Sequence, residues 1–203
     1  MANIVWNHPA SKEIFPIEDF GQAFQLDPLK IDVKSTGAKF DLKKLEWINA
    51  LYIRNMSDEQ LTRRLQEFLV DHLSKDKIAS VVPLIKERIK KLSDFIPLTD
   101  FLWEKPEYDR EVFNKSKIED LKEVLQRVLE SLEKIDKPWK SETFESTFRK
   151  LAEDLNISVS SCFQLIRVAV SGQLVTPPLF ESIQILSEDE AIKRVKEAIG
   201  FLQ

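Results

Sequence analysis

The stretch from Arg167 to Glu181, RVAVSGQLVTPPLFE, has residue types and spacing that could bind a ligand. Gly172 is placed to end a helix, because glycine adopts the left-handed C′ conformation without a Cβ penalty. Thr176 and Pro177 then predict the start of another helix, with a hydroxyl cap and a proline in the first turn. A helix N-terminus carries unpaired N–H groups and partial positive charge, which suit a phosphate or a base edge. A helical corner that binds nothing is the simpler alternative.

The sequence marks no residue as catalytic or as a metal ligand. His8 and His72 are the only histidines and lie too far apart in the chain to sit one helical turn from each other. Cys162 is the only cysteine, which excludes an internal disulfide and a multi-cysteine zinc site and fits a reducing compartment. The segment most similar to a P-loop is Thr36 to Phe40. It lacks the earlier glycine, the glycine directly before the lysine, and the Ser or Thr after the lysine that a P-loop requires. We therefore expect no catalytic residue, metal or cofactor in this chain.

The composition predicts an all-α fold. The chain has 203 residues, 43% of them hydrophobic and 32% charged, enough for one large core or two small ones. Only 4 glycines argue against a turn-rich β-sandwich, and the helix formers Leu, Lys and Glu dominate, so no strand is expected. The net charge of −4 means that nucleic-acid binding would need local basic patches. No apolar run approaches the ~18 residues of a membrane span, and no secretory signal is visible, so we expect a cytoplasmic protein without a membrane partner.

The first half of the chain shows a series of amphipathic helices. A short helix is expected from Ile17 to Phe24, and another is capped by Asp41 and continues along the apolar positions Leu42, Leu45, Ile48, Leu51 and Tyr52. Ser57 and Gln60 form a capping box, and the helix that they open buries Leu61, Leu65, Phe68, Leu69 and Leu73. The next helical stretch runs from about Lys77 to Leu92 and is kinked or divided at Pro83. The polar face of its second half forms the most basic short patch of the chain, made of Lys86, Arg88, Lys90 and Lys91. This patch either binds an anion or is an ordinary solvated helix face.

The second half continues the helical pattern. Capping boxes are predicted for Ser116 with Glu119 and for Ser187 with Glu190, and helix starts are predicted at Ser141 and near Ser158. The helix after Ser116 carries an apolar seam from Ile118 to Ile135, under three heptads long, which favours a bundle core over a coiled coil. The same seam leaves open a different class of function, a helical protein-interaction module.

Three segments carry a resemblance to a known family. They are the stretch from Phe40 to Arg54, FDLKKLEWINALYIR, the basic stretch with Lys86, Arg88, Lys90 and Lys91, and the motif from Arg167 to Glu181 with its Thr-Pro-Pro-Leu-Phe-Glu corner. They resemble the C-terminal anticodon-binding region of bacterial-type, discriminating glutamyl-tRNA synthetases, and the last motif is the most specific. The resemblance covers nearly the whole chain and implies the helical anticodon-binding domain of a class I aminoacyl-tRNA synthetase, with a remnant of the stem-contact fold at the N-terminus. It implies three parts: the end of the stem-contact region (residues 1–56) and two anticodon-binding helical lobes (residues 57–100 and 101–203).

The resemblance also implies a function and a site. The chain would bind and read the anticodon loop of glutamate tRNA, whose unstacked bases are open to side chains. Arg167, Thr176, Pro177 and Leu179 match the family's pocket for the first two anticodon bases, and Arg88 matches the arginine that reads the third. A guanidinium only donates hydrogen bonds. Arg88 should therefore favour cytosine, with two acceptors on its pairing edge, over guanine, with two N–H donors.

The family's N-terminal Rossmann half, with its two ATP signatures, has no counterpart in this sequence. The parent enzyme would be a glutamate-tRNA ligase that uses ATP and Mg²⁺, and this fragment alone would not be an enzyme. The expected partner is glutamate tRNA and not DNA. The similar anticodon domain of class I lysyl-tRNA synthetase is an alternative, and the Thr-Pro-Pro-Leu-Phe-Glu corner favours the glutamyl family.

Overall fold

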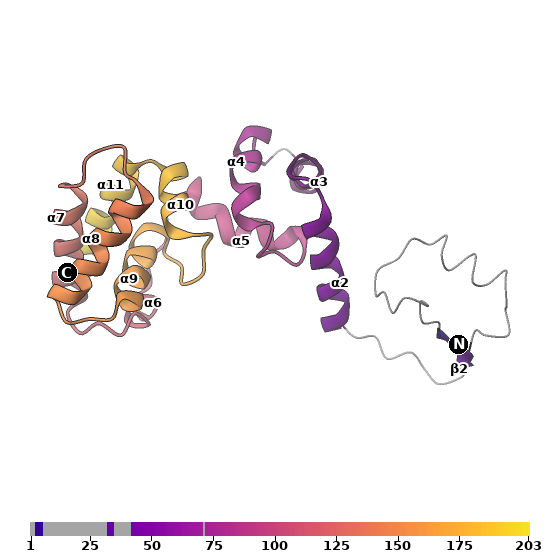
Figure 1. Ribbon diagram of the computed structural model, residues 1–203, viewed down its shortest axis with the longest axis horizontal. Coiled ribbons are helices and arrows are strands. Elements are labelled where there is room, and N and C mark those ends of the chain that lie inside the picture. The colour runs from indigo at the N-terminus through magenta and orange to yellow at the C-terminus, as the bar shows by residue number, and fades with distance from the viewer. Residues whose placement is uncertain (1–2, 6–31, 35–41, 71) are drawn as a thin grey trace. The chain divides into compact units, whose positions relative to one another are not determined.

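The computed structural model describes residues 3–5, 32–34, 42–70 and 72–203, and the chain divides into two compact units, Met1–Asn55 and Met56–Gln203 (Figure 1). In the first unit, strand β1 (Asn3–Val5) pairs antiparallel with β2 (Asp32–Lys34). This pair was not expected, because three residues are too few for an alternating pattern to stand out in a sequence. The helix expected from Ile17 to Phe24 lies outside the described residues.

Helix α2 (Leu42–Asn55) completes the described part of the first unit. Its predicted cap lies outside the described residues. The predicted apolar stripe of α2 is only partly buried, because Leu42, Leu45 and Tyr52 are exposed. The buried side chains of α2 are instead Ala50 and Ile53.

The second unit begins with α3 (Asp58–Leu69). The predicted capping box is confirmed: Ser57 Oγ accepts from the Gln60 backbone N–H at 3.2 Å, and Gln60 Oε1 accepts from the Ser57 N–H at 2.8 Å. Three of the predicted apolar positions are buried, Leu61, Leu65 and Leu69, and α3 packs against α4 (Lys75–Ile85). Phe68 is 49% exposed, so the apolar face is narrower than the sequence predicts.

Helix α4 contains Pro83 and ends at Ile85, so the helix that was expected to continue to Leu92 is shorter. The predicted basic helix face is wrong, because the basic residues of 86–91 lie in the turn that follows α4. The Asp94 carboxylate stabilises this turn by accepting from the backbone N–H groups of Lys90 at 2.9 Å and Lys91 at 3.1 Å. Short helices then lead to the rest of the second unit: η2 (Leu92–Asp94), α5 (Phe95–Thr99) and η3 (Asp100–Leu102).

The rest of the second unit is a helical bundle made of α6 (Arg110–Asn114), α7 (Leu121–Leu132), α8 (Ser141–Asp154), α9 (Val159–Ser171), α10 (Leu179–Leu186) and α11 (Glu188–Phe201) (Figure 1). Helices α7, α8, α9 and α11 surround one apolar core, and α9 contacts each of the other three. The apolar seam of α7 is buried in this core, as the bundle interpretation predicted. Within the described residues the second unit is all-helical, which confirms the predicted all-α class.

The helix caps show where local sequence rules succeed and where they fail. Ser158 caps α9 as predicted, with its Oγ accepting from the Ser161 N–H at 3.0 Å. The prediction for Ser116 is wrong: Asp120 caps α7 by accepting from the Glu123 N–H at 2.9 Å. Ser116 is buried at the end of α6 and donates to the carbonyl of Phe113 at 2.8 Å, so its hydroxyl is already used.

The last predicted capping box is half formed. Ser187 Oγ accepts from the Glu190 N–H at 3.3 Å, and α11 begins there as expected. The Glu190 carboxylate does not return to the Ser187 N–H, since it accepts instead from Lys193 and Arg194, both at 3.1 Å. The Glu190 side chain therefore pairs with basic residues of the next turn of α11 instead of completing the capping box.

Candidate nucleic-acid interface

The C-terminal end of α9 turns sharply at Gly172. This residue has a φ of +72°, and its N–H donates to the carbonyl of Val168 at 2.7 Å, which confirms the predicted helix stop. A Cβ at this position would lie 2.5 Å from the carbonyl oxygen of Glu107, far closer than atoms can pack. Glycine is required here both for its backbone conformation and for the close approach of another segment.

The predicted role of Thr176 as a helix cap is wrong. Helix α10 begins at Leu179, with Pro178 in the cap position and no side-chain cap. Thr176 is 4% exposed, and its Oγ1 accepts from Arg167 Nε at 3.1 Å while donating to the carbonyl of Pro177 at 2.8 Å. The threonine hydroxyl therefore orients an arginine of α9 instead of starting α10.

Arg88 reaches the same residue from the turn after α4. Its Nη1 donates to the backbone carbonyl of Thr176 at 3.2 Å, so Thr176 binds one arginine through its side chain and another through its main chain. Burial lowers the pKa of Arg167, and the nearby positive charge of Arg88 lowers it further. The structure thus joins two arginines that the sequence analysis assigned to separate base-binding positions.

No carboxylate in the described part of the chain pairs with Arg88 or Arg167, which together form the arginine pair. Among the residues that the structure describes, neither guanidinium forms an ion pair, and each makes one hydrogen bond, to Thr176. A guanidinium has five N–H donors, so most donors of both residues remain unused. Two like charges that meet at one residue, one of them partly desolvated, favour an anionic group or a cluster of hydrogen-bond acceptors as ligand.

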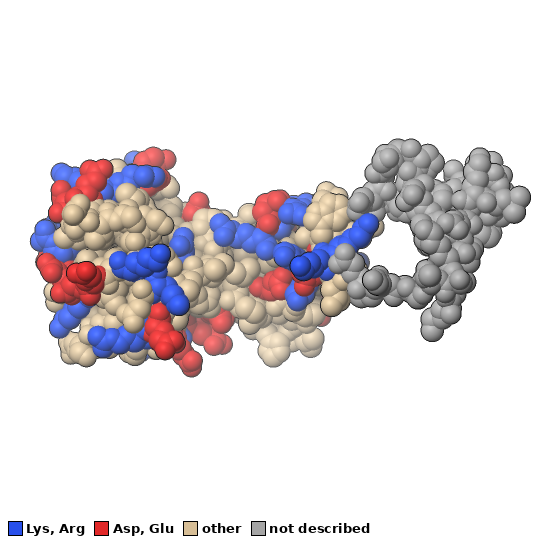
Figure 2. All heavy atoms as spheres, turned by 90° about the horizontal axis from the view of Figure 1, so that it is seen from below, with Lys and Arg blue, Asp and Glu red and all other residues tan. Residues whose placement is uncertain are grey.

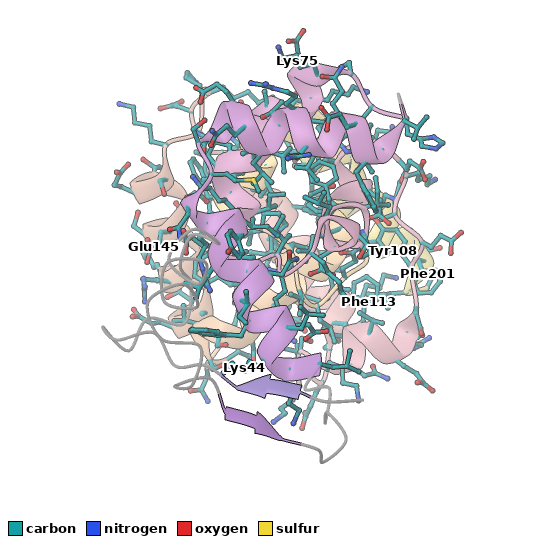
Figure 3. All side chains as sticks on the ribbon, turned by 90° about the vertical axis from the view of Figure 1, so that its right-hand side faces the viewer. Lys44, Lys75, Tyr108, Phe113, Glu145 and Phe201 are labelled. Atoms are coloured by element: carbon teal, nitrogen blue, oxygen red, sulfur yellow. The ribbon has the colours of Figure 1, made fainter. Side chains whose placement is uncertain are left out.

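A cleft of about 480 Å³ opens beside Arg167, between α8, α9 and α10. Its wall includes the predicted site residue Leu179 and the partly buried aromatic rings of Phe163 and Phe180. Arg149 also lines the cleft and forms an ion pair with Glu145, whose side chain is labelled in Figure 3. Aromatic and apolar walls next to an arginine provide a surface on which a nucleic-acid base can stack.

Sequence reasoning did not single out Phe163, Phe180 or Arg149. A signal for Phe163 was available, since it precedes Arg167 by one helical turn and must share its face of α9. No local signal identifies Arg149, because its place in the cleft depends on the packing of α8 against α9. Arg88 and Pro177 do not line this cleft, and both reach the site through Thr176.

The remaining members of the predicted basic patch are engaged in the structure. Lys86 is largely buried and pairs with Asp58 at 3.0 Å, which ties the turn after α4 to the start of α3. Lys90 and Lys91 each bind the Asp94 carboxylate through their backbone N–H groups. On the α6–α11 bundle, at the left of Figure 2, basic and acidic side chains are interspersed on the face shown. The unused donors of Arg88 and Arg167 are therefore the feature of this site that favours an anion.

The described residues show no competing chemical site. No cluster of His, Cys, Asp and Glu among them could hold a metal ion. Cys162 is buried, and burial raises its pKa to about 11, which disfavours the reactive thiolate. No helix in the described part of the chain is long and apolar enough to cross a membrane.

Comparisons with known proteins agree with this architecture. The anticodon binding domain family matches residues 60–199. A crystal structure of a glutamate tRNA ligase from Elizabethkingia meningosepticum has a TM-score of 0.75 and 23% identity, over 98% of this chain and 39% of that one. The fold is therefore that of the helical anticodon-binding domains of class I aminoacyl-tRNA synthetases.

The curated relatives point in the same direction. A glutamate–tRNA ligase of Corynebacterium jeikeium is 33% identical over 204 residues, covering 95% of this chain and 40% of that protein. One from Nocardioides sp. is 30% identical over 213 residues, covering 98% of this chain and 42% of the relative. The chain belongs to the anticodon binding domain family, and it spans about two fifths of the length of the glutamate–tRNA ligases it resembles. The resemblance to glutamyl-tRNA synthetases that the sequence suggested is confirmed.

Proposed function

We propose that this chain binds the anticodon loop of glutamate tRNA, as the anticodon-reading part of a glutamate–tRNA ligase. The observation that carries the proposal is the convergence of Arg88 and Arg167 on Thr176 beside a cleft with aromatic walls. Loop bases are unstacked and expose their edges and faces, so they can use both parts of this site. The arginine pair supplies hydrogen-bond donors, and the cleft supplies stacking surfaces.

Each predicted residue has a defined part in this proposal. Arg167 donates to a base edge or a phosphate near the cleft, and Thr176 fixes its orientation. Leu179, together with Phe163 and Phe180, packs against a base face. The backbone carbonyl of Pro177 accepts a hydrogen bond from the Thr176 hydroxyl and so restricts the conformation of the corner. These roles concern the first two anticodon bases.

Arg88 reads the third anticodon base in this proposal. Its bond to the Thr176 carbonyl uses one N–H and fixes the guanidinium plane, which leaves other N–H groups for a ligand. The pairing edge of cytosine presents acceptors to these donors, whereas that of guanine presents N–H groups. The site should therefore prefer the glutamate anticodon to the glutamine anticodon.

The other functions considered have less support. The apolar seam of α7 is buried against α8, α9 and α11, so it offers little surface to a protein partner. The curated relatives named above are glutamate–tRNA ligases, which favours the glutamyl over the lysyl assignment. We further propose that charging with ATP and Mg²⁺ belongs to the whole ligase in the cytoplasm. Glutamate-dependent pyrophosphate exchange by this chain alone would contradict that division of labour.

A pair of matched variants tests the proposed site. Arg167→Gln removes a charge from the arginine pair, and Arg127→Gln removes one from an exposed surface ion pair with Glu130. Charge-assisted hydrogen bonds are worth about 1.5–3 kcal/mol, so Arg167→Gln should weaken binding of glutamate tRNA about tenfold or more. Arg127→Gln should change it by less than about twofold. Equal effects of the two variants would contradict the site.

A further inference from the structure

The loop between α9 and α10, residues 172–178, has almost no backbone hydrogen bonds of its own. Within the described residues, the N–H groups of Leu174, Val175 and Thr176 are not paired with any backbone carbonyl. A segment without such bonds depends on side-chain contacts for its conformation. The position of Thr176, and with it the arginine pair, is therefore set by whatever holds this loop.

One side-chain contact that holds the loop comes from the segment that connects α5 to the α6–α11 bundle. Gln173 Nε2 donates to Asp100 Oδ1 at 2.9 Å, and the same carboxylate oxygen accepts from the Phe101 N–H at 2.7 Å. Gln173 also donates its backbone N–H to Ser171 Oγ at 3.1 Å, so both its main chain and its side chain are fixed. Only two residues separate Gln173 from Thr176, so a shift of Gln173 should also shift Thr176.

Asp100 can act as an anchor because the surrounding structure is rigid. Arg194 is 3% exposed and donates to the carbonyls of Phe101 at 2.6 Å and Val170 at 3.0 Å, joining the connecting segment to the end of α9. Tyr108 Oη lies 2.8 Å from the carbonyl of Ala169, and Figure 3 shows Tyr108 beside the labelled ring of Phe113. The C-terminal end of α9, where the loop begins, is therefore tied to the connecting segment, and Gln173 adds a second tie through Asp100.

We propose that Asp100 and Gln173 are a positioning pair for anticodon recognition: their hydrogen bond places Thr176 so that it can orient Arg88 and Arg167. The inference rests on the proposed function. Neither Asp100 nor Gln173 lines the cleft beside Arg167, and neither needs to touch the RNA. Their effect passes through the loop.

The charge around this pair makes a sharp test possible. Asp100 and Gln173 line a separate cavity of about 370 Å³, whose other charged lining residues are Glu104, Lys105 and Glu107. Gln173→Glu would place another carboxylate against Asp100, which should break the hydrogen bond and push the loop away. In the double variant Asp100→Asn with Gln173→Glu, the amide nitrogen at position 100 can donate to the carboxylate at position 173 while the amide oxygen accepts from the Phe101 N–H, so the contact is restored with its roles exchanged. This double variant also has the net charge of the unmodified chain, so general repulsion of RNA is unchanged.

The experiment measures the affinity of the full chain for glutamate tRNA and for the same tRNA with a glutamine anticodon. Gln173→Glu should weaken binding of glutamate tRNA about tenfold and reduce the preference between the two tRNAs. The double variant should recover most of both. Gln126→Glu, at an exposed position on α7, adds the same charge elsewhere and should change affinity by less than about twofold. Hydrogen exchange of the Gly172 and Gln173 amides, which are hydrogen-bonded to Val168 and Ser171, should be faster in Gln173→Glu and return toward the original rate in the double variant.

The outcomes separate the two proposals. If the unmodified chain shows no preference for glutamate tRNA, the proposed function fails and this inference fails with it. If the unmodified chain discriminates and Gln173→Glu discriminates equally well, only the positioning role is overturned. A double variant that binds no better than Gln173→Glu would also overturn it, provided that both retain the thermal unfolding transition of the original fold. Rescue of affinity, preference and loop protection together supports the pair.

Discussion

Arg194 and the arginine pair both lie near the C-terminal end of α9, and they have opposite surroundings. Arg194 donates to Glu190 and to the carbonyls of Phe101, Val170 and Glu104, all within 2.6–3.1 Å. Arg88 and Arg167 each make one hydrogen bond, to Thr176. The number of donors already used distinguishes an arginine that holds the fold together from one that is ready for a ligand.

The comparison also separates stability from function. A buried guanidinium with saturated donors compensates for its lost hydration, so removing it leaves several carbonyls unpaired. A partly buried guanidinium beside another cation is electrostatically unfavourable, and its removal should cost the fold little. Sites that bind ligands often keep such local penalties.

The largest expected effect is that of Arg194→Met. This substitution removes the donor to three carbonyls and the partner of Glu190, and breaking a buried charge pair from one side costs about 3–5 kcal/mol. We expect the free energy of unfolding, measured with urea, to fall by about that amount. Arg127→Met, at an exposed ion pair, should stay within about 0.5 kcal/mol of the original chain. A similar loss for both would contradict the structural role of Arg194.

A smaller effect is expected for Arg88→Gln, and on discrimination rather than on stability. Glutamine offers both a donor and an acceptor, so it can meet cytosine or guanine. A good bidentate base contact discriminates by about 1–3 kcal/mol in DNA, so the preference for the glutamate anticodon should fall about ten- to a hundredfold. If Arg88 binds a phosphate instead, both tRNAs will lose affinity equally and the dependence on salt will become shallower.

The free energy of unfolding should barely respond to Arg167→Gln. The variant loses the charge-assisted hydrogen bond to Thr176, worth about 1.5–3 kcal/mol, and gains a comparable amount from the removal of a partly buried charge next to Arg88. We expect a net change within about 0.5 kcal/mol, measured by urea unfolding. A loss as large as that of Arg194→Met would place Arg167 among the structural arginines.

The smallest expected effect is on the stability of the fold at acidic pH, through Glu190. Partial burial raises the pKa of Glu190, but the hydrogen bonds and charges of Arg194 and Lys193 outweigh it, and the net pKa lies below the ordinary 4.5. A depressed pKa stabilises the fold above the unfolded value, and this contribution is lost as the pH falls through the folded pKa. Glu190→Gln should therefore show a shallower loss of stability below about pH 4.5. An unchanged pH profile, with Glu153→Gln as a control for removing a carboxylate, would argue against this coupling.

Local sequence rules anticipated the helices and the turn at Gly172, because each depends on residues a few positions apart. They failed where two residues compete for one task. Asp120 replaces Ser116 as the cap of α7, since Ser116 is buried at the end of α6. Thr176 does not cap α10, because Arg167 occupies its hydroxyl.

The site itself was only partly predictable. The five proposed residues came from the resemblance to a family, and their roles remain predictions. The meeting of Arg88 with Thr176 depends on how the turn after α4 packs on the α9–α10 loop, which no local pattern encodes. The anchoring contact between Asp100 and Gln173 is likewise a long-range contact between two polar residues with no motif.

The preference of the unmodified chain between two tRNAs tests the central claim most directly. The two molecules are glutamate tRNA and the same tRNA with guanine in place of the cytosine at the third anticodon position, measured at two salt concentrations. If the arginine pair reads the anticodon, the first should bind about ten- to a hundredfold more tightly at both salt concentrations, because base contacts persist when phosphate contacts are screened. Equal affinities for the two tRNAs would contradict the account.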